Sequence, residues 1–342
     1  MKQNKLLLLV SGIVLLIAAV LAGNPAAAVK RDRREPSAVL CVYTTLPAEH
    51  AAVLAAEYEK QTNVRINFEV LPADNLLSRI IKEKAAPKAD AVLADRAVLE
   101  KGKEQKIFAE YVSEETDLVS DAFRDEDNAW TGVWYDPVVF CVNSDYLKGL
   151  ARYPLRWSEL PEFRSMRLGI TDFLAADAAG NLFCSLVEEL GEEKAFSLLR
   201  DLHPRVIQYA KYLSTPVRMA GMGEVDLAVA VQSESMRYIS EGYPLKLIYP
   251  ADGTAFMLTG IGVLKDGEAG KNARSFGDWL LGDEGQLVLQ SNGFFFVPAN
   301  PSALAGKSFA GKNIVLFTKP VPADGKRKHS LLDKWVKNIR LK

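Results

Sequence analysis

Residues 250–286 have the sequence PADGTAFMLTGIGVLKDGEAGKNARSFGDWLLGDEGQ, which predicts a turn, a strand and two helices in that order. The Asp-Gly pair at 252–253 is a turn signal, and the apolar run at 255–264 that follows it predicts a strand. Gly260 and Gly262 lack side chains, so they let another part of the backbone come close to this strand. The stretch therefore predicts one strand-helix unit of an α/β domain.

The two predicted helices follow a charged turn. In the first helix, Ala273, Phe276 and Leu280 fall on one face at helical spacing. The second begins near Asp283 and Glu284, because acidic side chains are favourable at the positive end of a helix dipole.

The N-terminal part of the chain alternates strands and helices. Apolar or alternating runs at 39–43, 64–70 and 89–94 predict three strands, and apolar residues at helical spacing between them predict two helices. This alternation favours a mainly parallel sheet. Ligands bind such sheets at the carboxyl ends of the strands. Here those ends carry Tyr43, Thr44, Thr45, Asp95 and Arg96.

Several short motifs in this order resemble the extracellular solute-binding proteins of bacterial ABC importers. They are L-x-x-R-I-x-x-E at 76–83, A-D-A-V at 89–92, P-x-x-W near 154–157, W-L-L-x-x-E-G-Q at 279–286 and V-P-x-N-P at 297–301. The most similar subgroup takes up ferric iron, thiamine, phosphonates or sugar phosphates. The resemblance implies a periplasmic or extracytoplasmic protein that closes on a small-molecule ligand and presents it to the importer's membrane subunits.

The resemblance also implies an α/β, two-lobed, type II periplasmic-binding-protein fold with crossover strands and a ligand cleft between the lobes. We expect residues 38–140 and 255–300 to form the first lobe and 141–254 the second. Residues 301–342 are expected to be a C-terminal helical segment packed on the lobes. We expect the protein to act as a monomer.

The N-terminus has the order of a secretory signal peptide. Basic residues at positions 2 and 5 precede an apolar run at 6–23 and small residues at 26–28. Residues 1–28 are therefore expected to be the signal and 29–37 a charged tether. An uncleaved N-terminal anchor is the alternative. A lipid anchor at this position is excluded, because Asn24 stands where the acylated cysteine would be.

The composition excludes several classes of function. The 342 residues contain 42 basic and 43 acidic side chains, a balance that argues against a nucleic-acid-binding surface. His50, His203 and His329 are isolated, so no metal-ligand cluster is visible. No P-loop, G-x-S-x-G or H-E-x-x-H motif occurs. We therefore expect neither an enzyme nor a bound cofactor.

The resemblance places the ligand-binding residues at strand ends and helix starts. They are Tyr43, Thr44, Thr45, Asp95, Arg96, Trp134, Tyr135, Gly180, Asn181, Ser214, Thr215, Gln232 and Ser233. Many relatives have S-G-T in the segment that we interpret as a polar loop at 177–181, where a hydroxyl and backbone N–H groups hold an anion. Here the residues are Ala179, Gly180 and Asn181, so only the backbone donors remain.

The predicted solute is an anionic organophosphate, phosphonate or sugar phosphate, with Arg96 or Arg218 as cationic contacts. Ferric relatives use two neighbouring tyrosines after the strand at 223–230, where this chain has Gln232 and Ser233. Tyr209 and Tyr212 are predicted to share a helix face but are displaced from that motif. Iron, thiamine or a polyamine stay open as alternatives, as does a sensor that presents its ligand to a membrane histidine kinase.

Overall fold

A computed structural model describes residues 36–319 and 325–342. The fold reported below is that of residues Ala38–Lys342. The predicted signal peptide and all of the predicted tether except Pro36 and Ser37 lie outside the described residues. Within the described ranges, no helix has the length and apolar character needed to cross a membrane.

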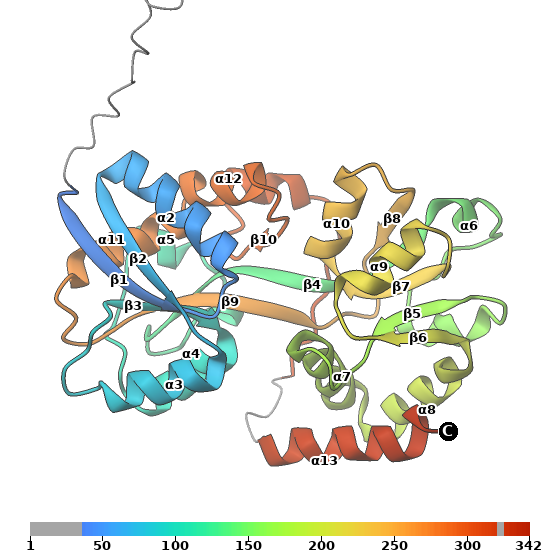
Figure 1. Cartoon of the computed structure of the whole chain (residues 1–342). Helices are drawn as coiled ribbons and strands as arrows, with labels where there is room; N and C mark the ends of the chain where they lie inside the picture. Colours follow the sequence, from blue (N-terminus) through green and yellow to red (C-terminus); the bar gives the residue numbers. More distant parts are fainter. Residues whose placement is uncertain (1–35, 320–324) are drawn as a thin grey trace, which may run out of the picture. The chain divides into compact units, whose positions relative to one another are not determined.

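The first half of the fold alternates strands and helices as the sequence pattern predicts (Figure 1). Its elements are β1 (Ala38–Thr44), α2 (Ala48–Thr62), β2 (Val64–Val70), α3 (Ala73–Lys82), β3 (Ala91–Asp95), α4 (Arg96–Glu104), α5 (Glu114–Asp117), η1 (Asp121–Phe123), β4 (Thr131–Asn143), α6 (Ser144–Lys148) and η2 (Trp157–Glu162).

The second half begins with parallel strands and their helices and then returns to the first sheet. Its elements are β5 (Leu168–Thr171), α7 (Asp177–Leu190), α8 (Glu192–Leu202), η3 (His203–Arg205), β6 (Val206–Ala210), α9 (Ser214–Gly221), β7 (Leu227–Val231), α10 (Gln232–Ser240), β8 (Leu245–Ile248), β9 (Phe256–Val263), α11 (Gly270–Leu281), α12 (Asp283–Ser291), β10 (Val297–Pro298), η4 (Leu304–Phe309), α13 (Gly325–Trp335) and η5 (Val336–Arg340).

One long strand, β4, joins two sheets. The strand order is β2-β1-β3-β9-β4-β7-β5-β6, and β8 and β10 also pair with β4. Residues 131–137 of β4 pair with β9, whereas residues 138–142 pair with β7. All 13 residues of β4 are buried. Because β4 changes partners in the middle, it carries the chain from one sheet to the other (Figure 1).

Each sheet has its own hydrophobic core, and these cores define two lobes. In the first lobe, β1, β3, β9 and α11 contribute Leu40, Leu93, Ile261 and Phe276, all fully buried. In the second lobe, β5, β7, α7 and α8 contribute Leu168, Leu227, Phe183 and Ala195 to a separate core. The fold is therefore a mixed α/β structure of two lobes linked through β4 and β9.

The glycines of β9 allow the close approach that the sequence predicts. A Cβ on Gly260 would lie 2.7 Å from the carbonyl oxygen of Thr131, and one on Gly262 would lie 2.7 Å from the ring of Phe108. Since real Cβ atoms do not come this close, a side chain at position 260 would force the backbone of β4 to shift, and one at position 262 would force the Phe108 ring to shift.

Two local predictions are wrong. Residues 177–181 are the first turn of α7 rather than a loop, because extended Ala176 precedes the helix and Ala178 and Ala179 favour helix. Tyr209 lies in β6 rather than on a helix, and Tyr212 lies in the turn after that strand. The two tyrosines therefore cannot share a helix face.

The C-terminal helix belongs to the core of the second lobe. Leu331, Leu332, Trp335 and Ile339 are buried there, and the Trp335 ring lies 4.8 Å from that of Phe173. Ion pairs link the exposed side of this segment to the same lobe, such as Arg327–Glu188 at 2.7 Å. Helix α13 runs beneath α7 and α8 in Figure 1. The segment therefore completes the second lobe.

Candidate functional site

Three helices of the second lobe begin where its strands end. Helix α7 follows β5, α9 follows β6, and α10 follows β7 directly. Strands β6 and β7 both pair in parallel with β5, so their carboxyl ends lie at one edge of the sheet. A small cavity of about 20 Å³ lies at this edge, lined among others by Thr171, Ala178, Ala179, Leu213 and Val231.

The starts of α7 and α9 have no side-chain caps. The residues before them, Ala176 and Leu213, have apolar side chains that accept no hydrogen bond from the helix. The first N–H groups of a helix carry about half a positive charge and are natural donors to an anion. Thr171 adds a hydroxyl, which is 3.5 Å from the carbonyl oxygen of Tyr212. The cavity therefore lies beside two helix starts and the Thr171 hydroxyl, in a lining that is otherwise mainly apolar.

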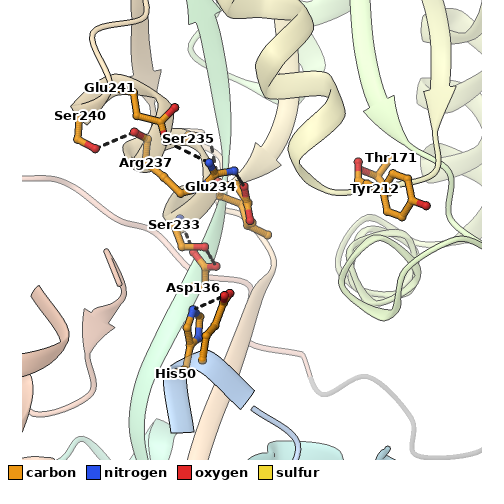
Figure 2. Close-up of polar contacts among 12 residues, drawn as sticks. His50, Asp136, Thr171, Tyr212, Ser233, Glu234, Ser235, Arg237, Ser240 and Glu241 are labelled. Atoms are coloured by element: carbon orange, nitrogen blue, oxygen red, sulfur yellow. Dashed lines mark hydrogen bonds and ion pairs between the residues drawn. The ribbon is translucent and has the colours of Figure 1, made fainter. Parts of the chain in front are cut away.

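The start of α10 is different, because a carboxylate from β4 already occupies it. Asp136 Oδ1 accepts the N–H of Ser233 at 2.9 Å, and Oδ2 accepts the Ser233 hydroxyl at 2.5 Å. Figure 2 shows the two side chains facing each other. Asp136 is only 8% exposed. This interaction also ties α10 to the strand that links the two lobes.

Burial, together with the charge of nearby Glu234, raises the pKa of Asp136 to about 7, although the hydrogen bonds from Ser233 lower it. Tyr249 is a further ionisable group beside this carboxyl. The folded chain thus holds a proton that the unfolded chain releases near pH 4. This contribution to stability is present below about pH 4 and is lost as the pH rises through about 7.

A pH titration of stability tests this shift. Asp136→Asn cannot ionise, so we expect the melting temperature of the wild type, relative to the variant, to fall between about pH 4 and pH 7 and then stay constant. Differential scanning fluorimetry at closely spaced pH values measures the difference, and the contribution of His50 cancels between the two proteins. A difference independent of pH would contradict the raised pKa.

The first lobe contributes His50 from α2. Its ring centroid lies 4.0 Å from that of Phe294, with the two ring planes tilted by 41°, and its Nδ1 atom is buried without a partner among the described residues. Burial lowers the pKa of His50, whereas the charges of Glu49 and of Glu234 on α10 raise it. Figure 2 shows His50 on the side of Asp136 opposite to α10. A neutral imidazole thus stands near the start of α10.

The predicted residues at the end of β1 are bonded within the first lobe. Tyr43 Oη donates to Glu83, which follows the last residue of α3, at 2.8 Å, and burial raises the pKa of this phenol to about 12. Thr44 Oγ1 donates to the carbonyl oxygen of Leu93 at 2.7 Å. Thr45 is half-buried, and its N–H lies 3.4 Å from the same oxygen.

Asp95 and Arg96 lie at the start of α4. Arg96 Nε is 3.3 Å from Glu100, and its guanidinium lies 5.6 Å from the Trp130 ring centroid. The backbone of Asp95 pairs with Thr259 of β9, but its carboxylate makes no hydrogen bond or ion pair with a residue in the described ranges. Burial and the charge of Asp177 in the second lobe raise its pKa to about 6. Asp95 is thus a carboxylate without a cationic partner there.

Trp134 and Tyr135 pack inside the first lobe. The Trp134 ring stacks on Phe296 at 5.5 Å, and the Tyr135 ring stacks on Phe123 at 4.9 Å. Burial raises the pKa of Tyr135 to about 12. Both aromatic rings therefore have a packing role within the first lobe.

Gly180 and Asn181 lie in the first turns of α7, where Lys328 of α13 reaches them. Lys328 Nζ donates to Asn181 Oδ1 at 3.2 Å and is 3.7 Å from Asp177. A Cβ on Gly180 would lie 3.2 Å from Lys328 Cε. The C-terminal helix therefore supplies a cation beside the start of α7.

Ser214, Thr215, Gln232 and Ser233 begin α9 and α10. The two residues of α9 are half-buried next to the cavity-lining Leu213. Gln232 is fully buried; its amide donates to the carbonyl oxygen of Phe295, and its oxygen accepts the Tyr249 hydroxyl at 2.6 Å. Of the predicted arginine contacts, Arg218 is exposed and lies 3.7 Å from Glu224.

Four residues of this region have no place in the predicted site: Asp136, Thr171, His50 and Lys328. Asp136 alone has a signal in the sequence, since a carboxylate inside a long apolar strand requires a buried partner. The partners of the others come from distant segments. Lys328 and Asn181, for example, are 147 residues apart.

Comparisons with known proteins agree with this fold. The model of the bacterial extracellular solute-binding protein family matches residues 86–312, which is 227 of the 342 residues. An uncharacterized protein of Haemophilus influenzae is 25% identical, with 100% of this chain and 99% of that protein aligned.

Two solved structures confirm the two-lobed architecture. The periplasmic binding protein AfuA from Actinobacillus pleuropneumoniae, with exogenous fructose-6-phosphate bound, superimposes with a TM-score of 0.69 and 24% identity over 90% of this chain and 100% of that one. Iron-bound HitA from Pseudomonas aeruginosa gives 0.71 and 20% over 87% and 99%. The two names give different solutes, so these similarities establish the fold alone.

Proposed function

Because the chain belongs to the bacterial extracellular solute-binding proteins, which deliver small solutes to ABC importers, we propose that its own solute has an anionic head group. Sugar phosphates, phosphonates and other organophosphates have this property. The uncapped starts of α7 and α9, which meet beside Thr171 at one cavity, are the observation that carries the proposal. Lys328 adds a positive charge beside α7.

The proposed binding cycle is closure of the two lobes around the solute. We propose that the hinge lies where β4 changes partners, between Pro137 and Val138, and where β9 begins at Phe256. The solute would stabilise the closed form through contacts with both lobes, and the importer's membrane subunits would bind that form. The predicted contacts Thr45, Asn181, Ser214, Thr215 and Ser233 are proposed as residues near the solute.

The contacts of the residues after β7 make ferric iron a weaker candidate. Hard cations need charged or phenolic oxygen donors. Gln232 and Ser233 directly follow β7, and neither supplies such a donor. Gln232 is hydrogen-bonded to Phe295 and Tyr249, and Ser233 is hydrogen-bonded to Asp136.

A cationic solute is the second candidate, because of one observation. Asp95 of the first lobe has no cationic partner in the described ranges, and its pKa is raised by burial and by Asp177 of the second lobe. An ammonium group between these carboxylates would relieve their repulsion. Thiamine or a polyamine would supply such a group.

A ligand panel distinguishes these candidates. The exported protein is melted with fructose 6-phosphate, 2-aminoethylphosphonate, ferric citrate, thiamine and spermidine, and each response is repeated by isothermal titration calorimetry. At 100 times its dissociation constant, the true solute stabilises the folded state by about 2.7 kcal/mol. A response confined to phosphorylated compounds supports the proposal. A response only to thiamine or spermidine favours a cationic solute bound between Asp95 and Asp177. A response only to ferric citrate contradicts both the anionic and the cationic candidates.

A further inference from the structure

We propose that Arg340 of η5 is a positioning residue for solute binding. It acts through Asp172, and the two side chains together fix the turn at 172–176, which leads from β5 into α7. The inference rests on the proposed binding of the solute at this edge of the second lobe, but it does not depend on the charge of the solute. Arg340 needs no contact with the solute for this role.

The turn is built around the carboxylate of Asp172. Its Oδ1 atom accepts the N–H of Leu174 at 2.9 Å, and the carbonyl oxygen of Asp172 accepts the N–H of Ala175 at 2.9 Å. The N–H of Asp172 donates to the carbonyl oxygen of Ala210 at 2.8 Å, which ties the turn to the end of β6. An aspartate that accepts a hydrogen bond from the backbone two residues further on stabilises a turn in this way. The orientation of the Asp172 carboxylate therefore fixes the path of the chain into α7.

Arg340 holds the other oxygen of this carboxylate. Its Nε atom donates to Asp172 Oδ2 at 3.0 Å, and its guanidinium lies 4.5 Å from the ring centroid of Tyr209 in β6. The Asp172 side chain is 19% exposed and that of Arg340 is 36% exposed, so the pair is partly withdrawn from water. A planar guanidinium that also rests on an aromatic ring loses little freedom when it binds a carboxylate. Arg340 thus joins the turn after β5 to the neighbouring strand.

The C-terminal segment also contacts the residues that follow Asp172. The Trp335 ring lies 4.8 Å from that of Phe173, and Lys328 Nζ donates to Asn181 Oδ1 at 3.2 Å. Phe173 is 2% exposed, so core packing fixes it. The contact of Arg340 with Asp172 is partly exposed, and its removal is therefore expected to loosen the turn without unfolding the lobe.

The turn lies where the solute is expected to bind. Thr171, directly before it, lines the cavity at the strand ends. Burial and the charge of Asp177, directly after it, raise the pKa of Asp95 in the first lobe, so the end of the turn faces that lobe. A segment that is already fixed before the solute arrives does not have to be ordered on binding. Arg340 is therefore expected to increase the affinity for the solute.

Hydrogen exchange without any solute tests the position of the turn. Arg340→Met keeps an apolar stem but removes the charge and the donors, and Lys342→Met removes an equal charge at an exposed position as the matched control. We expect the amides of Leu174 and Ala175 to exchange about 5-fold faster in Arg340→Met, because Asp172 supplies their acceptors. The control should exchange like the wild type. Equal exchange in Arg340→Met and the wild type would overturn the proposal.

Calorimetry with fructose 6-phosphate tests the effect on binding. Asp172→Asn keeps an oxygen acceptor for the N–H of Leu174 but removes the charge. We expect the affinity to fall about 5-fold in Arg340→Met and in Asp172→Asn, with no further loss in the double variant, because both substitutions break one contact. Arg340→Lys keeps the charge and should restore part of the affinity. Unchanged affinity in Arg340→Met, or additive losses in the double variant, would overturn the proposal.

Failure of the proposed function gives a different result. The wild type would then bind no phosphorylated compound, while the faster exchange of the turn in Arg340→Met would persist. The same set of variants is in that case titrated with the compound of the ligand panel that does bind, and the same two outcomes decide whether Arg340 positions the turn for binding.

Discussion

Replacing Ala178 by aspartate is expected to weaken binding of the anionic solute at least 100-fold while the protein stays folded. Ala178 is half-buried, lies in the first turn of α7 and lines the cavity. A carboxylate in a first helical turn stabilises the helix, so the fold is not at risk. The same charge about 4 Å from a bound anion costs about 4 kcal/mol at an effective dielectric constant of 20, which exceeds a 100-fold change. Isothermal titration calorimetry measures the loss.

Two variants provide matched controls for this substitution. Ala175→Asp introduces the same charge three residues earlier at an exposed position that does not line the cavity, and its affinity should stay within about 3-fold of the wild type. Ala178→Asn has almost the same size as aspartate without the charge, so it separates steric from electrostatic effects. If Ala178→Asp binds a phosphorylated solute normally, the anion does not lie at α7. Tighter binding of thiamine by this variant would favour the cationic candidate.

The elements of the fold could be predicted because their signals are local. The apolar run at 255–264 corresponds to β9, and Ala273, Phe276 and Leu280 form the buried face of α11. The periodicity of a helix or a strand is a pattern among residues that are close in the sequence, and the family motifs indicate the order of these elements.

The candidate site could be predicted only in part, because its contacts are not local. The sequence predicts that a residue lies at the end of a strand, but it does not predict the partners of its side chain; the hydroxyl of Tyr43, for example, donates to Glu83. Asp136 meets Ser233 across 97 residues, and no periodic pattern relates the two. The sequence therefore predicts the edge of the sheet but does not predict that the Asp136 carboxylate binds the start of α10.

Trp335→Ala is expected to lower the free energy of unfolding of the second lobe by about 3–5 kcal/mol, as for other large buried aromatic side chains. Trp335 is 1% exposed and comes from the C-terminal helix. Its ring lies 4.8 Å from that of Phe173, 6.4 Å from Phe183 and 5.5 Å from Tyr209, so truncation opens a cavity among three aromatic rings. Urea unfolding followed by circular dichroism measures the loss.

Lys337→Ala, two residues further along at an exposed position, is the matched control and should change stability by less than about 0.5 kcal/mol. Trp335→Ala should also weaken solute binding. The reason is that Phe173, which contacts Trp335, lies four residues before the start of α7 at Asp177, and its carbonyl oxygen lies close to Gly180. If Trp335→Ala leaves the urea midpoint unchanged, the C-terminal helix is not part of the folded lobe. In that case Lys328 could not be held beside α7, and the positive charge would have to be removed from the proposed site.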